Sequence, residues 1–234
     1  MSEPANNAAG APAILLAMTA VTGIVDAVSF LALGHVFTAN MTGNIVFLGF
    51  AIGGAPGVSI PRSLLALAFF FIGALIGGKM TSQMTAQNSG QAVIRAVIRA
   101  SVVEVFLLLT AATIAIGLTT PSEDHQLQLQ GVIVTTAIAM GLRNAVVRKL
   151  GVADLTTTVL TLTITGLAAD SSLVGGDNPR WQRRCAAILA MIGGAAAGAL
   201  MLTQSVALPL YACGVITAAC VFAWLRSESY RLAS

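Results

Sequence analysis

Residues 23–49 read GIVDAVSFLALGHVFTANMTGNIVFLG and place four polar side chains, Asp26, Asn40, Thr42 and Asn44, inside an otherwise apolar stretch. An unpaired polar group in such surroundings loses hydration that its apolar neighbours cannot replace. Each of these side chains therefore needs a partner, a water path or a ligand, and the rest of the chain is best understood from this requirement.

The whole chain has the composition of an integral membrane protein. Of its 234 residues, 56% are hydrophobic and 9% are charged, and its mean hydropathy is +0.87, whereas soluble domains carry about 25% charged residues. Only helices and closed barrels satisfy the backbone in lipid, and long runs rich in Leu, Ala and Gly favour helices. The expected partner is the lipid bilayer. The formal charge of +3 comes without a basic patch interleaved with aromatic residues, so we expect no nucleic-acid partner.

Two of the apolar segments are poor membrane spans. In 36–54 the uninterrupted apolar part covers only residues 45–52, or about 12 Å of helix against roughly 30 Å of hydrocarbon. Segment 151–169 carries six Thr residues, and its alternation VLTLTIT suits a short extended piece as well as a helix. We expect both segments to be broken or re-entrant. The remaining apolar segments are 12–33, 63–80, 93–118, 128–147, 185–204 and 206–225.

The distribution of Lys and Arg tests these alternatives through the positive-inside rule. If all eight segments cross, the two sides carry six basic residues each. If neither 36–54 nor 151–169 crosses, every Lys and Arg except Arg62 lies on one side, which is then cytoplasmic together with the C-terminus. If 36–54 crosses and 151–169 does not, one side of the membrane again carries eleven basic residues and the other carries one. The charges therefore argue against a crossing at 151–169 and leave 36–54 open.

A weak internal repeat helps to decide whether segment 36–54 crosses the membrane. Residues 141–167 read GLRNAVVRKLGVADLTTTVLTLTITGL and resemble the opening stretch, with Asn144 in the place of Asp26 at an offset of 118. Pro61 and Pro179 are related by the same offset. We predict an all-α integral membrane protein, residues 1–234 as one membrane domain, with about six transmembrane helices and two re-entrant segments. Its two inverted repeats of about 117 residues would cover 12–118 and 128–226, as in many secondary transporters. Seven or eight helices is the alternative.

Glycine pairs indicate close helix packing. Gly73 and Gly77 form one small-xxx-small pattern, and Gly194 and Gly198 form another in the second half. We expect the two patterns to face each other within one chain. A homodimer formed through either pair is the alternative.

Two acidic residues lie inside predicted spans. Asp26 lies two-thirds of the way along the first span, where a charged acid costs on the order of 2.5–3.5 kcal/mol. It can be neutral, pair with Arg143, form a structural bond between helices, or belong to a proton or cation path. For Glu104, in segment 93–118, Arg143 is also the expected partner.

The run from Asn40 to Asn44 supplies the candidate binding residues. It combines amide donors, the Thr42 hydroxyl and Gly43, which tolerates unusual backbone angles. One interpretation is a simple helix cap formed by Asn40 or Thr42. The other is that the helix N-termini of both re-entrant segments point toward a central site for an anionic or carbonyl-bearing ligand.

The second half would complete that site. Asn144 occupies the position equivalent to Asp26, and Thr157 and Thr161 would form the opposing wall. We expect no metal or cofactor, since the chain has two His and its three Cys form no CxxC pair. Signature motifs for hydrolysis, phosphoryl transfer or dinucleotide binding are missing, so we do not expect an enzyme.

Two long motifs resemble the YoaK-like family of bacterial inner-membrane proteins of unknown function. They are TGIVDAVSFLALGHVFTANMTGNIVFLG and AMGLRNAVVRKLGVADLTTTVLTLTITGLAADS, and the likeness covers about residues 12–226. The resemblance implies a multi-pass protein of the bacterial plasma membrane and supplies no substrate. From the residues we expect a transporter or channel for a small solute, with proton coupling through Asp26. A structural or accessory membrane protein without transport is the alternative.

Overall fold

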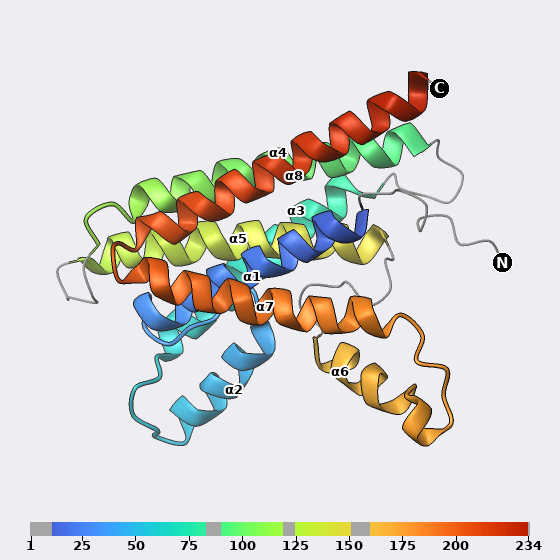
Figure 1. Ribbon diagram of the computed structural model, residues 1–234. Coiled ribbons are helices and arrows are strands. Elements are labelled where there is room, and N and C mark those ends of the chain that lie inside the picture. Colours follow the sequence, from blue (N-terminus) through green and yellow to red (C-terminus); the bar gives the residue numbers. More distant parts are fainter. Residues whose placement is uncertain (1–10, 83–89, 119–124, 151–159, 234) are drawn as a thin grey trace.

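The computed structural model describes residues 11–82, 90–118, 125–150 and 160–233. Within these ranges the chain is helical and contains no strand, as predicted (Figure 1). The helices are α1 (Ala11–Ala32), α2 (Met41–Ile52), α3 (Ile60–Met80), α4 (Gly90–Ile114), α5 (Gln126–Leu150), α6 (Leu160–Ala169), the short 3-10 helix η2 (Ser172–Val174), α7 (Trp181–Leu202) and α8 (Ala207–Ala233).

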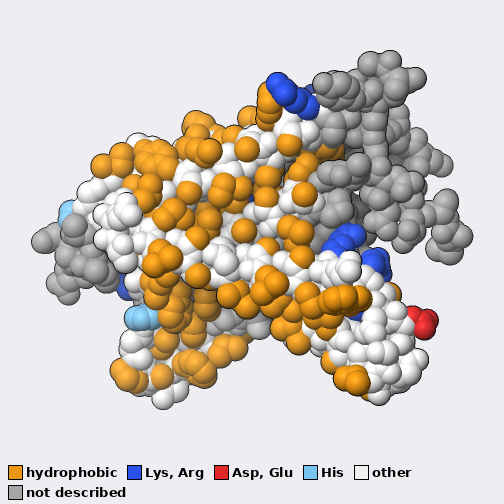
Figure 2. Space-filling view, in the orientation of Figure 1, with side chains coloured by type: hydrophobic (Ala, Val, Ile, Leu, Met, Phe, Trp, Pro, Cys, Tyr) orange, Lys and Arg blue, Asp and Glu red, His pale blue; other side chains and the backbone are white. Residues whose placement is uncertain are grey.

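Six of the described helices, α1, α3, α4, α5, α7 and α8, are long and apolar enough to cross a membrane. They form the elongated bundle of Figure 1, and apolar side chains cover much of the face seen in Figure 2. Exposed apolar surface of this extent is expected where lipid, not water, is the solvent. The prediction of six spans is therefore confirmed, and the chain is a multi-pass membrane protein.

The other two helices, α2 and α6, are too short to cross. They have 12 and 10 residues, or about 18 and 15 Å, against roughly 30 Å of hydrocarbon. Figure 1 shows that α3 begins at the end of the bundle where α1 finishes, and that α7 begins at the end where α5 finishes. Each short helix is therefore flanked by chain segments at a single end of the bundle. Residues 160–169 of the predicted Thr-rich segment are helical, and residues 151–159 lie outside the described part of the chain.

The helix contacts have an internal symmetry. Helix α1 packs on α7 and α5 packs on α3, α8 packs on α1 and α4 on α5, and α2 and α6 pack on α3 and α7. If α1, α2, α3 and α4 are exchanged with α5, α6, α7 and α8 in that order, each of these helix contacts becomes another contact that the structure also contains. The pairing between α4 and α8 is converted into itself.

Glycines allow two of these pairs to approach closely. A Cβ atom at Gly194 of α7 would overlap the carbonyl oxygen of Ala20 in α1, and one at Gly141 of α5 would overlap the carbonyl oxygen of Phe70 in α3. The prediction that the two glycine patterns face each other is wrong. Gly73 packs on α5 and Gly194 packs on α1, so the glycine pattern of each half packs against the first helix of the other half.

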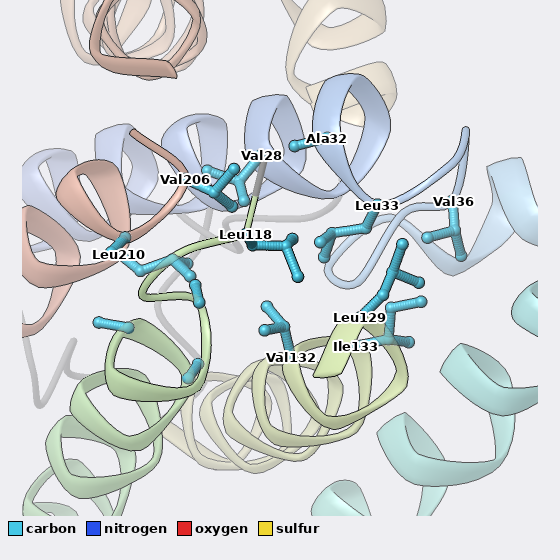
Figure 3. Packing of buried hydrophobic residues seen from close by; sticks show 14 of the residues in the cluster. Val28, Ala32, Leu33, Val36, Leu118, Leu129, Val132, Ile133, Val206 and Leu210 are labelled. Atoms are coloured by element: carbon cyan, nitrogen blue, oxygen red, sulfur yellow. The ribbon is translucent and has the colours of Figure 1, made fainter. Parts of the chain in front are cut away.

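Core residues fix the chain where it leaves α1. Leu33 and Val36 follow the last turn of α1, and neither is exposed to solvent. Figure 3 shows them inserted between α1 and α5, in a cluster that also includes Leu118, Ile133 and Leu210. The segment that connects α1 to α2 is thus packed into the core at this end of the bundle.

Candidate functional site

The loop 33–40, between α1 and α2, enters the helix bundle. It begins with two residues of positive φ, Gly34 at 89° and His35 at 56°, which turn the chain back toward the bundle. Ala39 is buried in the same core cluster as Leu108, in the last third of α4, and Met140, near the middle of α5. The chain therefore carries non-helical backbone well inside the bundle.

Asp26 of α1 holds the far end of this loop. Its Oδ1 accepts a hydrogen bond from the Ala39 backbone N–H at 3.1 Å, and its Oδ2 accepts one from the Asn40 side-chain amide. The Asp26 side chain is almost fully buried. Of the alternatives left open by the sequence, pairing of Asp26 with Arg143 is wrong, because the partners of Asp26 are loop residues.

Asn44 of α2 holds the middle of the loop. Its Oδ1 accepts from the Phe37 backbone N–H at 2.9 Å, and its Nδ2 donates to the Phe37 carbonyl at 2.5 Å. One amide side chain thereby satisfies both backbone groups of Phe37, as a neighbouring strand would. Backbone without a regular partner is tolerated at membrane depth only when it is satisfied in this way or by water.

The expected cap on α2 is not formed. Asn40 occupies the N-cap position, but its side chain makes no capping bond to the helix and donates to Asp26 instead. Thr42 is exposed in the first turn. A Cβ atom at Gly43 would overlap the ring of Phe37. Gly43 is thus required by packing against the loop.

Aromatic rings cover the outer side of the loop. The Phe37 ring stacks on those of Phe30 and Phe47, with centroids 5.2 and 5.6 Å away, and the Phe30 and Phe47 centroids are 6.1 Å apart. His35 is exposed and lies edge-on to Phe30. This arrangement packs the loop against both α1 and α2.

The candidate residues of the second half do not join this site in the described part of the chain. Asn144 donates to the Met140 carbonyl of its own helix at 2.8 Å. Thr161 is exposed on α6, which packs on α7 and lies apart from α2 in Figure 1. Thr157 lies outside the described residues.

A second polar cluster links α1, α4 and α5. Arg143 of α5 pairs with Glu104 of α4, as predicted, and its Nε donates to Glu104 Oε1 at 2.6 Å. Its Nη1 also donates to the Met18 carbonyl at 3.1 Å and to the Thr22 hydroxyl at 3.2 Å, both in α1. Both charged side chains are 2% exposed.

The α1 partners of Arg143 were not predicted. Met18 and Thr22 are separated by one helical turn and thus share a face, but their sequence context does not indicate which helix lies opposite. Among the described residues, no three His, Cys, Asp or Glu side chains lie close enough together to share a metal ion. The two polar clusters contain carboxylates, amides, hydroxyls and one guanidinium.

Comparisons with known proteins agree with the helical architecture. Residues 14–223 match the family described as "Protein of unknown function (DUF1275)". The chain is also 39% identical over 158 residues to "UPF0700 transmembrane protein YoaK" of Bacillus subtilis (strain 168). That alignment covers 68% of this chain and 65% of the relative, so it spans just under two thirds of the relative's length. No solved structure matches.

Proposed function

The chain belongs to the DUF1275 family of proteins of unknown function, and we propose that it is a transporter or channel for a small solute in the bacterial inner membrane. The loop 33–40 and α2 form the movable wall of the solute path. Asp26 and Asn44 hold this wall closed. The C-terminus lies in the cytoplasm.

The observation that carries this proposal is the non-helical backbone of loop 33–40 inside the helix bundle. Such backbone is expensive in a membrane, because each unpaired N–H or C=O group costs several kcal/mol in hydrocarbon. A membrane protein with a purely structural role can avoid this cost by crossing the membrane with continuous helices. In secondary transporters, broken helices and unwound backbone within the membrane form the substrate and ion sites.

The contact symmetry supports the same proposal. Two inverted repeats, α1–α4 and α5–α8, account for the exchange of contacts and for the placement of α2 and α6 beside opposite ends of the bundle. In transporters of this kind, the two halves rock against each other around a site near the midplane. Loop 33–40 enters the bundle from the first half.

The orientation follows from the basic residues. Arg62 lies at the end of the bundle where α3 begins, and the other eleven Lys and Arg residues lie toward the opposite end by their positions in the helices. Positively charged segments are retained in the cytoplasm. The end that carries the C-terminus of α8 is therefore the cytoplasmic one.

Asp26 offers a route to proton coupling. Both of its carboxylate oxygens accept hydrogen bonds from the loop. Protonation removes the negative charge from the acceptor, and hydrogen bonds to a neutral carboxyl group are weaker than those to a carboxylate. A proton on Asp26 therefore loosens the wall that the carboxylate holds.

Uptake into proteoliposomes tests the proposal. Vesicles with the purified protein and vesicles without protein are compared across a panel of amino acids, sugars, nucleosides, organic acids and amines. We expect at least one solute to enter only the protein-containing vesicles. The variant Asn44→Ala, which leaves both backbone groups of Phe37 unpaired, should change that uptake at least tenfold, whereas Thr42→Ala should not.

A structural or accessory role is the second candidate, because the hydrogen bonds of Asp26 and Asn44 are all made within the chain. In that case Asn44→Ala would lower the yield of folded protein and no panel solute would enter the vesicles. Measuring folded protein beside uptake separates the two candidates.

A further inference from the structure

A cavity of about 60 Å³ lies between α1, α4, α5 and α8, beside the Glu104–Arg143 pair. Its walls include Met18 of α1, Thr217 and Trp224 of α8, and the two charged residues. The helix segments around it belong to the half of the bundle that carries the C-terminus. The cavity has no part in the loop site at Asp26.

Thr217 presents a buried hydroxyl without a partner to this cavity. Thr217 is not exposed to solvent, and its Oγ1 makes no hydrogen bond. Leaving such a group unsatisfied is costly, because the hydration that it gives up on burial is not replaced. Other threonines within the described helices donate to the carbonyl four residues earlier, namely Thr19, Thr22, Thr110, Thr113, Thr135, Thr136 and Thr165.

Arg143 contributes a second unused donor. A guanidinium has five N–H groups. The Nε group donates to Glu104, Nη1 donates to Met18 and Thr22, and Nη2 contacts Glu104 in the ion pair. No hydrogen bond is made by Nη2. One N–H group of Nη2 therefore remains available for an acceptor in the cavity.

The other residues of the cavity wall indicate the chemistry of the rest of the ligand. Apart from the residues already named and Ser101, they consist largely of apolar side chains, Leu15, Leu142, Val146 and Val221 among them. A group that fills this space needs hydrogen-bond acceptors at one end and an apolar body at the other. At roughly 10–15 Å³ for each water-sized group, the cavity holds about four to six such groups.

Charge favours an anion over a neutral acceptor. Glu104 is neutralised by Arg143, and the exposed side chains of Arg95, Arg99 and Arg148 lie on the same two helices, α4 and α5, as the cavity walls. Basic residues around a cleft raise the local concentration of anions. We propose that this cavity binds a short-chain monocarboxylate of three or four carbons, its head group on Arg143 and Thr217 and its chain against the apolar walls. The site goes beyond the proposed transport, because binding can be measured whether or not any solute crosses the membrane.

Thermal unfolding of the purified full-length protein in detergent tests this site. Propionate and butyrate should raise the midpoint in a saturable manner, whereas sodium chloride at equal ionic strength, butanol and butylamine should not. The variant Thr217→Val keeps the shape of the side chain and removes only an unpartnered hydroxyl, so it should fold as well as the wild type. It should bind butyrate about tenfold more weakly, since a hydrogen bond to a charged group is lost.

Thr110→Val is the matched control, because the Thr110 hydroxyl bonds only its own helix outside the cavity walls. Its affinity for butyrate should equal that of the wild type. Three results would overturn the proposal: no shift with propionate or butyrate, an equal shift with butanol or chloride, or unchanged butyrate affinity in Thr217→Val. Weaker butyrate binding in Thr217→Val without loss of solute uptake would support the proposed site and show that it is separate from the transport path.

Discussion

Removing one charge of the Glu104–Arg143 pair should strongly destabilise the protein. In Glu104→Met the guanidinium keeps its bonds to Met18 and Thr22 but loses both contacts with the carboxylate. With both side chains 2% exposed, water and salt screen the remaining charge only weakly. Breaking a buried pair of this kind costs about 3–5 kcal/mol.

Removing both charges should restore much of that stability. In the double variant Glu104→Met and Arg143→Met no buried charge is left, and replacement of a buried pair by apolar residues of similar volume is often neutral or stabilising. The Thr22 hydroxyl stays satisfied, because it also donates to the Met18 carbonyl at 3.0 Å. We expect the double variant to lie within about 2 kcal/mol of the wild type, and well above either single variant.

Reversible unfolding in mixed detergent and SDS micelles, followed by circular dichroism, gives these free energies. Trp224 lines the cavity beside the pair, so its fluorescence reports the same region locally. Asp170→Asn is the control, because the Arg184–Asp170 pair is half open, with Asp170 43% exposed. It should cost less than about 1 kcal/mol. Single variants that lose less than about 1 kcal/mol, or a double variant as unstable as the worse single, would refute this reasoning.

Two further predictions concern helix packing and topology. Gly194→Ala should lower the free energy of unfolding by about 1–3 kcal/mol, because the added Cβ would overlap the α1 backbone. Gly193→Ala should leave the free energy of unfolding unchanged, because no atom lies within 4 Å of its added Cβ. Equal effects of the two substitutions in the same SDS titration would contradict this packing. In a cysteine-free background, Ala55→Cys should react with a membrane-impermeant maleimide only from the periplasmic side, and Leu173→Cys only from the cytoplasmic side, since each follows a short helix that does not cross. Labelling of both positions from one side would show that one short segment crosses.

Hydropathy and charge predicted the architecture because both depend on local sequence. Six apolar runs of sufficient length became six long helices, and the short run 45–52 became part of the 12-residue helix α2. The uneven distribution of Lys and Arg indicated that 151–169 does not cross, and the helix ends that flank α6 agree. The ion pair of Glu104 could be expected, because a buried acid needs a base and few bases lie inside predicted spans.

The partners of the other polar residues could not be predicted, because they depend on how distant segments pack. Asp26 bonds a loop 13 residues away and Arg143 bonds α1 at a separation of 125 residues. Asn44 was singled out as a candidate binding residue, and in the structure its side chain bonds both backbone groups of Phe37. The sequence could identify these side chains as needing partners, but it could not choose among the partners.

The central claim is that a small solute crosses the membrane along a path closed by the loop that Asp26 holds. The most direct test is the initial rate of solute uptake by proteoliposomes that contain equal amounts of folded wild-type, Asp26→Asn or Thr110→Val protein. The amide introduced by Asp26→Asn has one acceptor oxygen where the carboxylate has two, so the loop loses one of its two bonds. We expect uptake by the wild type and by Thr110→Val, and a rate in Asp26→Asn that differs at least tenfold and no longer responds to a pH gradient. Equal rates in all three proteins, or no uptake of any solute by the wild type, would contradict it.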